Sequence, residues 1–201
     1  MLIDLHKRLA SLLRRFHRDE RGVVAMETVI IMPFLVTGLL FALGFYDFYL
    51  QKNVRDKATY TMTDALSRET SVIDATYIDN LKTTFDMIAG SRSPSQMRVS
   101  VIRFHKTSNN NDWYELRWSE VRGNGGLSAL TQADIDKAEE VARLPLMVGG
   151  QDLILVETSG RHVPIFASEF IDTLELNTRM FMTPRFASQL CFTGVCVPTS
   201  S

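Results

Sequence analysis

The sequence predicts an α+β protein, in which one long N-terminal helix precedes a small domain built around an antiparallel sheet. Three observations lead to this fold class. An apolar run covers residues 23–46, and apolar residues at three- to four-residue spacing continue in residues 51–69. The second half of the chain alternates apolar and polar residues between turn-rich segments, as antiparallel strands do.

The apolar run is long enough to cross a membrane. Residues 23–46 contain one charged residue, Glu27. A helix of this length spans roughly 36 Å, which exceeds the roughly 30 Å hydrocarbon core of a bilayer. A core helix of a soluble protein would be shorter and would carry a polar stripe, so we expect a transmembrane helix.

Charge is distributed unevenly around this run. The 201 residues have a net charge of -1, which does not favour a nucleic-acid-binding protein, and 45% hydrophobic residues exclude a disordered one. Residues 1–22 hold six basic and three acidic side chains, so the rest of the chain is net -4. Basic flanks stay in the cytoplasm, which predicts that the chain after Asp47 lies outside the inner membrane. Tyr46, Phe48 and Tyr49 then stand where an outer aromatic belt forms.

A conventional signal peptide is the competing interpretation of the same run. Ala42, Leu43 and Gly44 form a small-x-small triplet of the kind that signal peptidase accepts. The apolar region would, however, exceed the usual length of about 7–15 residues and would carry an acid.

Glu27 requires an explanation, because a carboxylate at the bilayer centre costs about 2.5 kcal/mol or more. One interpretation is a side chain that snorkels to the cytoplasmic headgroups. The other depends on Gly22: if the chain is cut after this residue, Val23 becomes a free amino terminus and Glu27 the fifth residue. The α-amine and the carboxylate of neighbouring subunits can then neutralise each other at low dielectric.

The stretch from Arg18 to Asp47 resembles the N-terminal region of the TadE/TadF-like minor pseudopilins of the tight-adherence (Flp) pilus system. In that family a charged leader ends in glycine, and the following apolar helix has glutamate at its fifth position, then a proline, and an acid near its outer end. Gly22, Glu27, Pro33 and Asp47 match this pattern. Thr28 departs from the aromatic or apolar residue that usually follows the glutamate, and the leader is long.

The resemblance implies a structural component of a Flp (Tad) pilus or a related type II/IV secretion apparatus, and not an enzyme. It implies that a prepilin peptidase cuts between Gly22 and Val23, that Glu27 serves assembly, and that Pro33 introduces a modest kink. The expected partners are the peptidase, other pilins and pseudopilins, the inner-membrane assembly platform and membrane lipid, with no nucleic acid, small-molecule substrate or cofactor.

The expected location is the inner membrane, crossed once, with a cytoplasmic N-terminus and a periplasmic domain that can also enter the surface pilus. The expected division is residues 1–22 as a cleaved leader, 23–49 as the transmembrane helix, 50–70 as a helical stalk and 71–201 as the extracytoplasmic α+β domain. The alternative function is a membrane-tethered extracytoplasmic binding module that keeps its N-terminus.

The body of the chain predicts further elements. The charged side chains of residues 51–69, Arg55 among them, are expected to form a solvated face. A second helix is expected at residues 74–89, with Gly90 as its C-cap. We expect a short acidic helix at 134–143, irregular structure from His162 to Phe170, and strands at 97–106, 113–121, 152–157 and 174–182, the first two joined as a hairpin.

Residues with chemical potential are few. Cys191 and Cys196 are expected to form a disulfide outside the cytoplasm. The four histidines are scattered and are expected on the surface or in loops, and residues 109–112 lack an EF-hand spacing. No catalytic set, metal site or cofactor site emerges. Pro184, Arg185 and Phe186 resemble a proline-arginine element near the end of TadE-like domains.

Overall fold

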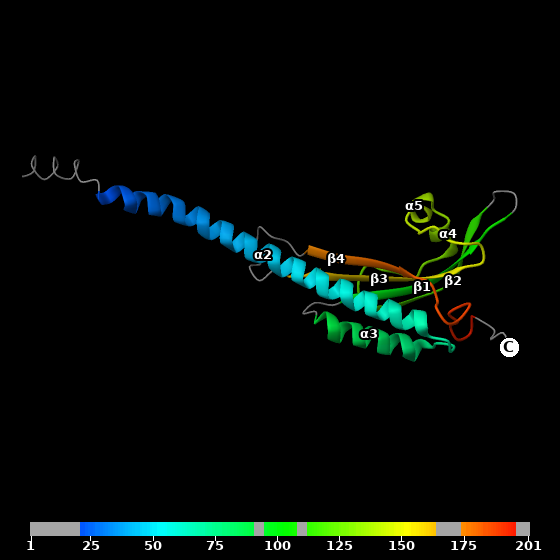
Figure 1. Ribbon diagram of the computed structural model, residues 1–201. Coiled ribbons are helices and arrows are strands. Elements are labelled where there is room, and N and C mark those ends of the chain that lie inside the picture. Colours follow the sequence, from blue (N-terminus) through cyan, green and yellow to red (C-terminus); the bar gives the residue numbers. More distant parts are fainter. Residues whose placement is uncertain (1–20, 91–94, 108–111, 164–173, 196–201) are drawn as a thin grey trace, which may run out of the picture. The chain divides into compact units, whose positions relative to one another are not determined.

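The computed structural model describes residues 21–90, 95–107, 112–163 and 174–195. Its contacts divide the chain into two units, residues 1–46 and residues 47–201. The elements (Figure 1) are α2 (Arg21–Arg68), α3 (Ala75–Ala89), β1 (Ser95–His105), β2 (Trp113–Gly123), α4 (Gln132–Ile135), α5 (Ala138–Val141), β3 (Asp152–His162) and β4 (Leu174–Met182). The predicted α+β arrangement of a long apolar N-terminal helix followed by a small domain with an antiparallel sheet is confirmed.

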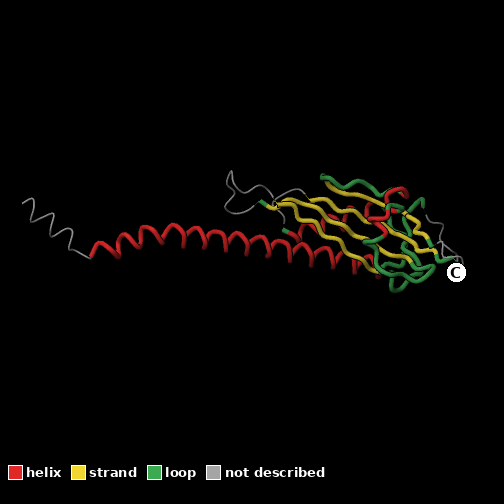
Figure 2. The backbone as a smooth tube through the Cα atoms, turned by 90° about the horizontal axis from the view of Figure 1, so that it is seen from above, coloured by secondary structure: helices red, strands yellow, loops and turns green. Residues whose placement is uncertain are grey.

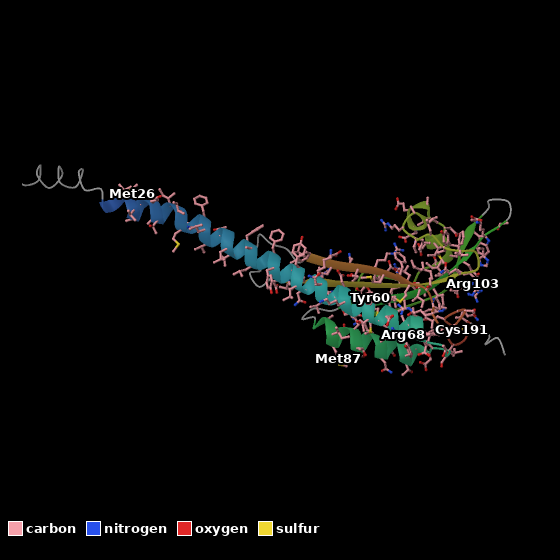
Figure 3. All side chains as sticks on the ribbon, in the orientation of Figure 1. Met26, Tyr60, Arg68, Met87, Arg103 and Cys191 are labelled. Atoms are coloured by element: carbon pink, nitrogen blue, oxygen red, sulfur yellow. The ribbon has the colours of Figure 1, made fainter. Side chains whose placement is uncertain are left out.

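The first unit consists, in its described part, of the beginning of α2. Figure 3 shows side chains projecting all around this part of the helix, and large apolar ones such as Val24 (67%) and Phe34 (76%) are exposed. The helix continues through Pro33. Within the described residues, α2 is the one helix long and apolar enough to cross a membrane, and its most apolar window buries nothing.

The second unit is built on a four-stranded sheet with the order β2-β1-β3-β4, in which every neighbouring pair is antiparallel. Figure 2 shows the four strands side by side. The predicted hairpin is confirmed as β1 and β2, and the predicted strand at 174–182 as β4. The strand predicted at 152–157 extends to His162, so the irregular structure predicted from that residue is wrong at His162 itself, while residues 164–170 lie outside the described ones.

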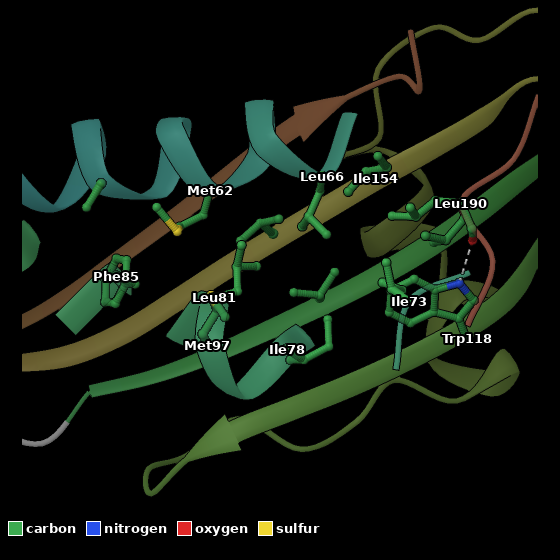
Figure 4. Packing of buried hydrophobic residues seen from close by; sticks show 14 of the residues in the cluster. Met62, Leu66, Ile73, Ile78, Leu81, Phe85, Met97, Trp118, Ile154 and Leu190 are labelled. Carbon is green, nitrogen blue, oxygen red and sulfur yellow. Dashed lines mark hydrogen bonds between the residues drawn. The ribbon is translucent and has the colours of Figure 1, made fainter. Parts of the chain in front are cut away.

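One face of the sheet packs against α3 and the part of α2 that belongs to the second unit (Figure 4). Leu66, Phe85, Val99 and Ile154 are fully buried in this cluster. The α3 helix has the predicted ends: the Asp74 carboxylate accepts a hydrogen bond from the Tyr77 amide at 2.8 Å, and Gly90 adopts a left-handed conformation. The capping residues and the core packing thus place α3 at the same residues.

The opposite face of the sheet carries a smaller cluster in which Ile102 and Leu155 pack with Ile135 of α4. The single acidic helix predicted at 134–143 is wrong, because the chain forms the two short helices α4 and α5. Lys137 between them has an extended backbone, with φ -67° and ψ 130°. The Asp134 carboxylate accepts hydrogen bonds from Thr131 and contacts Lys137 at 2.7 Å, so it forms the capping box that sets the start of α4.

Candidate functional site

The residues chosen from the sequence for processing and assembly lie at the start of α2. Gly22 is in the first turn, and a Cβ added there would meet nothing within 4 Å. Val23 is 61% exposed. Residues 1–20 lie outside the described part of the chain, so cleavage of the leader stays a prediction.

Glu27 is exposed one turn further along the same helix. No ion pair or hydrogen bond links its carboxylate to another residue in the described part of the chain. The hydroxyls of the two threonines in this region bond within the helix, Thr28 to the Val24 carbonyl at 2.8 Å and Thr37 to the Pro33 carbonyl at 2.7 Å. A partner for the Glu27 carboxylate would therefore lie outside the described residues or in another molecule.

Asp47, the acid directly after the apolar run, contacts a residue at the C-terminal end of β3. Its Oδ2 atom lies 3.0 Å from Nε2 of His162. His162 is 8% exposed, and its ring meets the ring of Phe48 edge-on at 6.1 Å. The prediction that His162 lies on the surface or in a loop is wrong, because α2 and Phe48 cover the end of β3. The sequence carried no local signal for this pair.

The expected solvated face of the second part of α2 is wrong at Arg55, which is 1% exposed. Its guanidinium lies over the Phe85 ring at 5.6 Å and against Gly160 of β3, where any Cβ would be 2.6 Å from its Cζ. Nε and Nη2 are buried without a hydrogen-bond partner in the described part of the chain. Burial lowers the pKa of Arg55, and the nearby charges of Asp86 and Asp56 offset this only in part.

A polar stripe on α2 explains how a guanidinium reaches this position. Thr59, Thr63 and Ser67 follow Arg55 at four-residue spacing and are all buried. The Thr59 hydroxyl is 3.0 Å from the Thr158 hydroxyl of β3. These small side chains let α2 approach the sheet closely. Their four-residue spacing in the sequence was the signal that could have identified the buried face of α2.

The C-terminal segment is tied to the ends of α2 and α3. The Arg185 amide donates to the Ser67 carbonyl at 2.8 Å, and its guanidinium lies 3.1 Å from the Asp64 carboxylate. Cys191 is buried (Figure 3 labels it), and its carbonyl accepts from the Ile73 amide at 2.9 Å. Cys196 lies outside the described residues, so the predicted disulfide stays a prediction.

A partly exposed group of ion pairs joins β1 and β2. His105 Nε2 is 2.7 Å from a Glu115 carboxylate oxygen, Arg117 contacts the other oxygen at 3.1 Å, and Trp113 stacks on the imidazole at 4.2 Å. Burial acts to raise the pKa of Glu115, but the hydrogen bond to His105 and the charge of Arg117 together hold it below its usual value. No group of three or more metal-ligating side chains occurs within residues 21–90, 95–107, 112–163 and 174–195. Asn109, Asn110 and Asn111 lie outside these ranges.

Comparison of the chain with protein-family models, with curated proteins and with solved structures finds no match.

Proposed function

We propose that the chain is a minor pseudopilin, a structural or assembly component of a Flp-type (Tad) pilus or related secretion apparatus, processed by a prepilin peptidase after Gly22. The observation that carries the proposal is Glu27, the single charged side chain in an apolar helix, without a partner in the described chain and five residues after Gly22. A carboxylate in that setting needs a neutralising group, and the α-amine of a cut neighbouring subunit supplies one.

The proposed location follows from the same helix. The apolar part of α2 crosses the inner membrane once, with the basic residues before it in the cytoplasm and the second unit in the periplasm. The partners are the peptidase, other pilins and pseudopilins, the assembly platform and membrane lipid. The role is structural and not enzymatic, and the compact second unit serves as the part that neighbouring subunits contact.

The experiment expresses the full chain in cells that contain the matching prepilin peptidase and determines the intact mass of the membrane-extracted protein. The wild-type chain is expected to begin at Val23. The Gly22→Ala variant is expected to keep its leader, while Gly38→Ala, a matched change further along α2, is expected to be cut normally. Glu27→Gln, in the same assay, is expected to be cut but to lose co-purification with the other pilins, because its side chain can no longer neutralise an amine.

Two results would contradict the proposal. A wild-type chain that keeps residues 1–22 in such cells would show that the peptidase does not cut after Gly22. A Glu27→Gln chain that still co-purifies with pilins would show that assembly does not need the carboxylate. Both results together would favour the alternative function, a membrane-tethered binding module with an uncleaved N-terminus.

A further inference from the structure

One end of the sheet extends toward Asp47. The pairing of β1 with β3 stops at Ser95 and Gly160, whereas β3 and β4 remain paired for two more residues each, up to His162 and Leu174. This two-stranded extension meets α2 through the contact of His162 with Asp47. The end of β3 and the start of β4 therefore lie beside the residue at which the second unit begins.

Large apolar and aromatic side chains are exposed at this end. We call Tyr49 (57%), Leu50 (46%), Val163 (51%) and Leu174 (42%) the basal patch. Tyr49 and Leu50 follow Asp47 within one helical turn, Val163 follows His162, and Leu174 is the partner of His162 in the register of β4. Single exposed apolar residues are ordinary, but these four come from three segments that meet at this one end of the second unit.

The charges around the basal patch balance. Lys52 and Arg161 are exposed cations here, while Glu175 is an exposed acid and Asp47 is the acid of the pair with His162. A strongly charged partner would have no electrostatic preference for such a surface. An interface of zwitterionic headgroups fits it, because tyrosine rings are favoured there and long cationic side chains can reach the phosphate groups.

The position of the membrane also matches. A helix of the 28 residues from 23 to 50 spans roughly 42 Å, which matches the roughly 40–45 Å of a bilayer with both headgroup layers, so a centred helix places Asp47, Tyr49 and Leu50 in the outer headgroup layer. Tyr49 and Leu50 lie within about 5 Å of Asp47 along the helix axis, at 1.5 Å per residue. The headgroup layer on each side is roughly 5–7 Å thick.

We infer that the basal patch is a lipid-contact surface: it lies in the outer headgroup layer, so the second unit rests on the bilayer at the β3–β4 end. This inference depends on the transmembrane helix of the proposed function and adds to it a contact between the folded domain and lipid. The balanced charges imply that phosphatidylcholine is sufficient and that anionic lipid changes the contact little.

The experiment reconstitutes the full chain in phosphatidylcholine vesicles whose acyl chains carry bromine near the headgroup, and compares Trp fluorescence with that in unbrominated vesicles. Leu174→Trp places the probe in the basal patch. Val148→Trp is the matched control, because Val148 is 74% exposed and lies just before Asp152, the end of β3 remote from His162. The native Trp113 and Trp118 supply the baseline. The fluorescence added by Trp at position 174 is expected to be quenched by bromine, and that added at position 148 is expected to be unaffected.

The outcomes separate the inference from the proposed function. If the chain floats with the vesicles after carbonate extraction but the position-174 probe is not quenched, the lipid contact is overturned and the membrane helix is not. If the chain does not float with the vesicles, the membrane helix and the lipid contact are both overturned. If the Trp probe at position 174 is shielded from water only at a high protein-to-lipid ratio, and bromine never quenches it, a second copy of the chain covers the basal patch. The inference is then wrong.

Discussion

The two units of the chain use apolar side chains in opposite ways. In the first unit Phe34 is 76% exposed, on the part of α2 whose described large apolar side chains are exposed. In the second unit Phe85 is fully buried between α2, α3 and the sheet, and it also lies against the Arg55 guanidinium. Within the described residues, the first unit leaves its apolar surface exposed, whereas the second unit buries its apolar side chains in its own core. Side chains of the same type therefore contribute to the stability of the second unit and not to that of the described part of the first.

The largest expected difference between the two units comes from truncating one phenylalanine in each of them. Phe85→Ala is expected to lower the free energy of unfolding of the second unit by about 3–5 kcal/mol, because it removes a fully buried ring and leaves a cavity. Phe34→Ala, the matched control, is expected to change it by less than about 0.5 kcal/mol. The measurement is urea unfolding of the full chain in detergent micelles, followed by the fluorescence of the buried Trp118. Equal losses in the two variants would contradict the division into independent units.

The features that the sequence predicts correctly are those with local causes. The α3 helix carries its own signals, Asp74 at its start and Gly90 at its end, and the alternating apolar residues Met97, Val99 and Val101 of β1 pack into one core cluster. In the candidate site, the roles of Gly22 and Glu27 stay predictions, drawn from their spacing together with the basic leader and the apolar run, and the structure adds that Glu27 has no partner in the described residues.

The features that the sequence does not predict depend on contacts between distant segments. The order of the sheet, with β3 between β1 and β4, has no local signal. Arg55 looks like a surface residue until Gly160 is placed beneath it, and His162 looks like a loop residue until Asp47 and Phe48 cover it. In the last two cases a polar side chain takes a buried tertiary role that its type disfavours.

A smaller effect tests the close contact of Arg55 with Gly160. Gly160→Ala is expected to destabilise the second unit by about 1–3 kcal/mol, because the added methyl overlaps a guanidinium that is buried and has little room to move. Gly126→Ala, where a Cβ meets nothing within 4 Å, is the matched control and is expected to cost far less. The same urea titration measures both variants.

A double-mutant cycle identifies Arg55 as the cause. Arg55→Met alone is expected to be neutral or stabilising by about 1 kcal/mol, since it replaces buried donors that lack partners with an apolar side chain of similar length. In the Arg55→Met background, Gly160→Ala is expected to lose most of its cost. A penalty for Gly160→Ala that is the same in both backgrounds would show that the overlap is with the backbone and not with the guanidinium.

The smallest expected effect concerns pH and is confined to the second unit. Because the folded-state pKa of Glu115 lies below the ordinary value of 4.5, the ion pairs of this carboxylate stabilise the fold above that pH, and this stability is lost as the pH falls through the folded pKa. The contribution is about 0.5 kcal/mol, as expected for a partly exposed pair. Glu115→Gln is therefore expected to lower stability slightly at pH 7 and to reduce the loss of stability that the wild type undergoes below pH 4.5.

Glu139→Gln removes an exposed acid of α5 and serves as the control, which is expected to keep the wild-type acid dependence. A Glu115→Gln chain with the same loss of stability at low pH as the wild type would mean that His105 and Arg117 hold this carboxylate too weakly to matter.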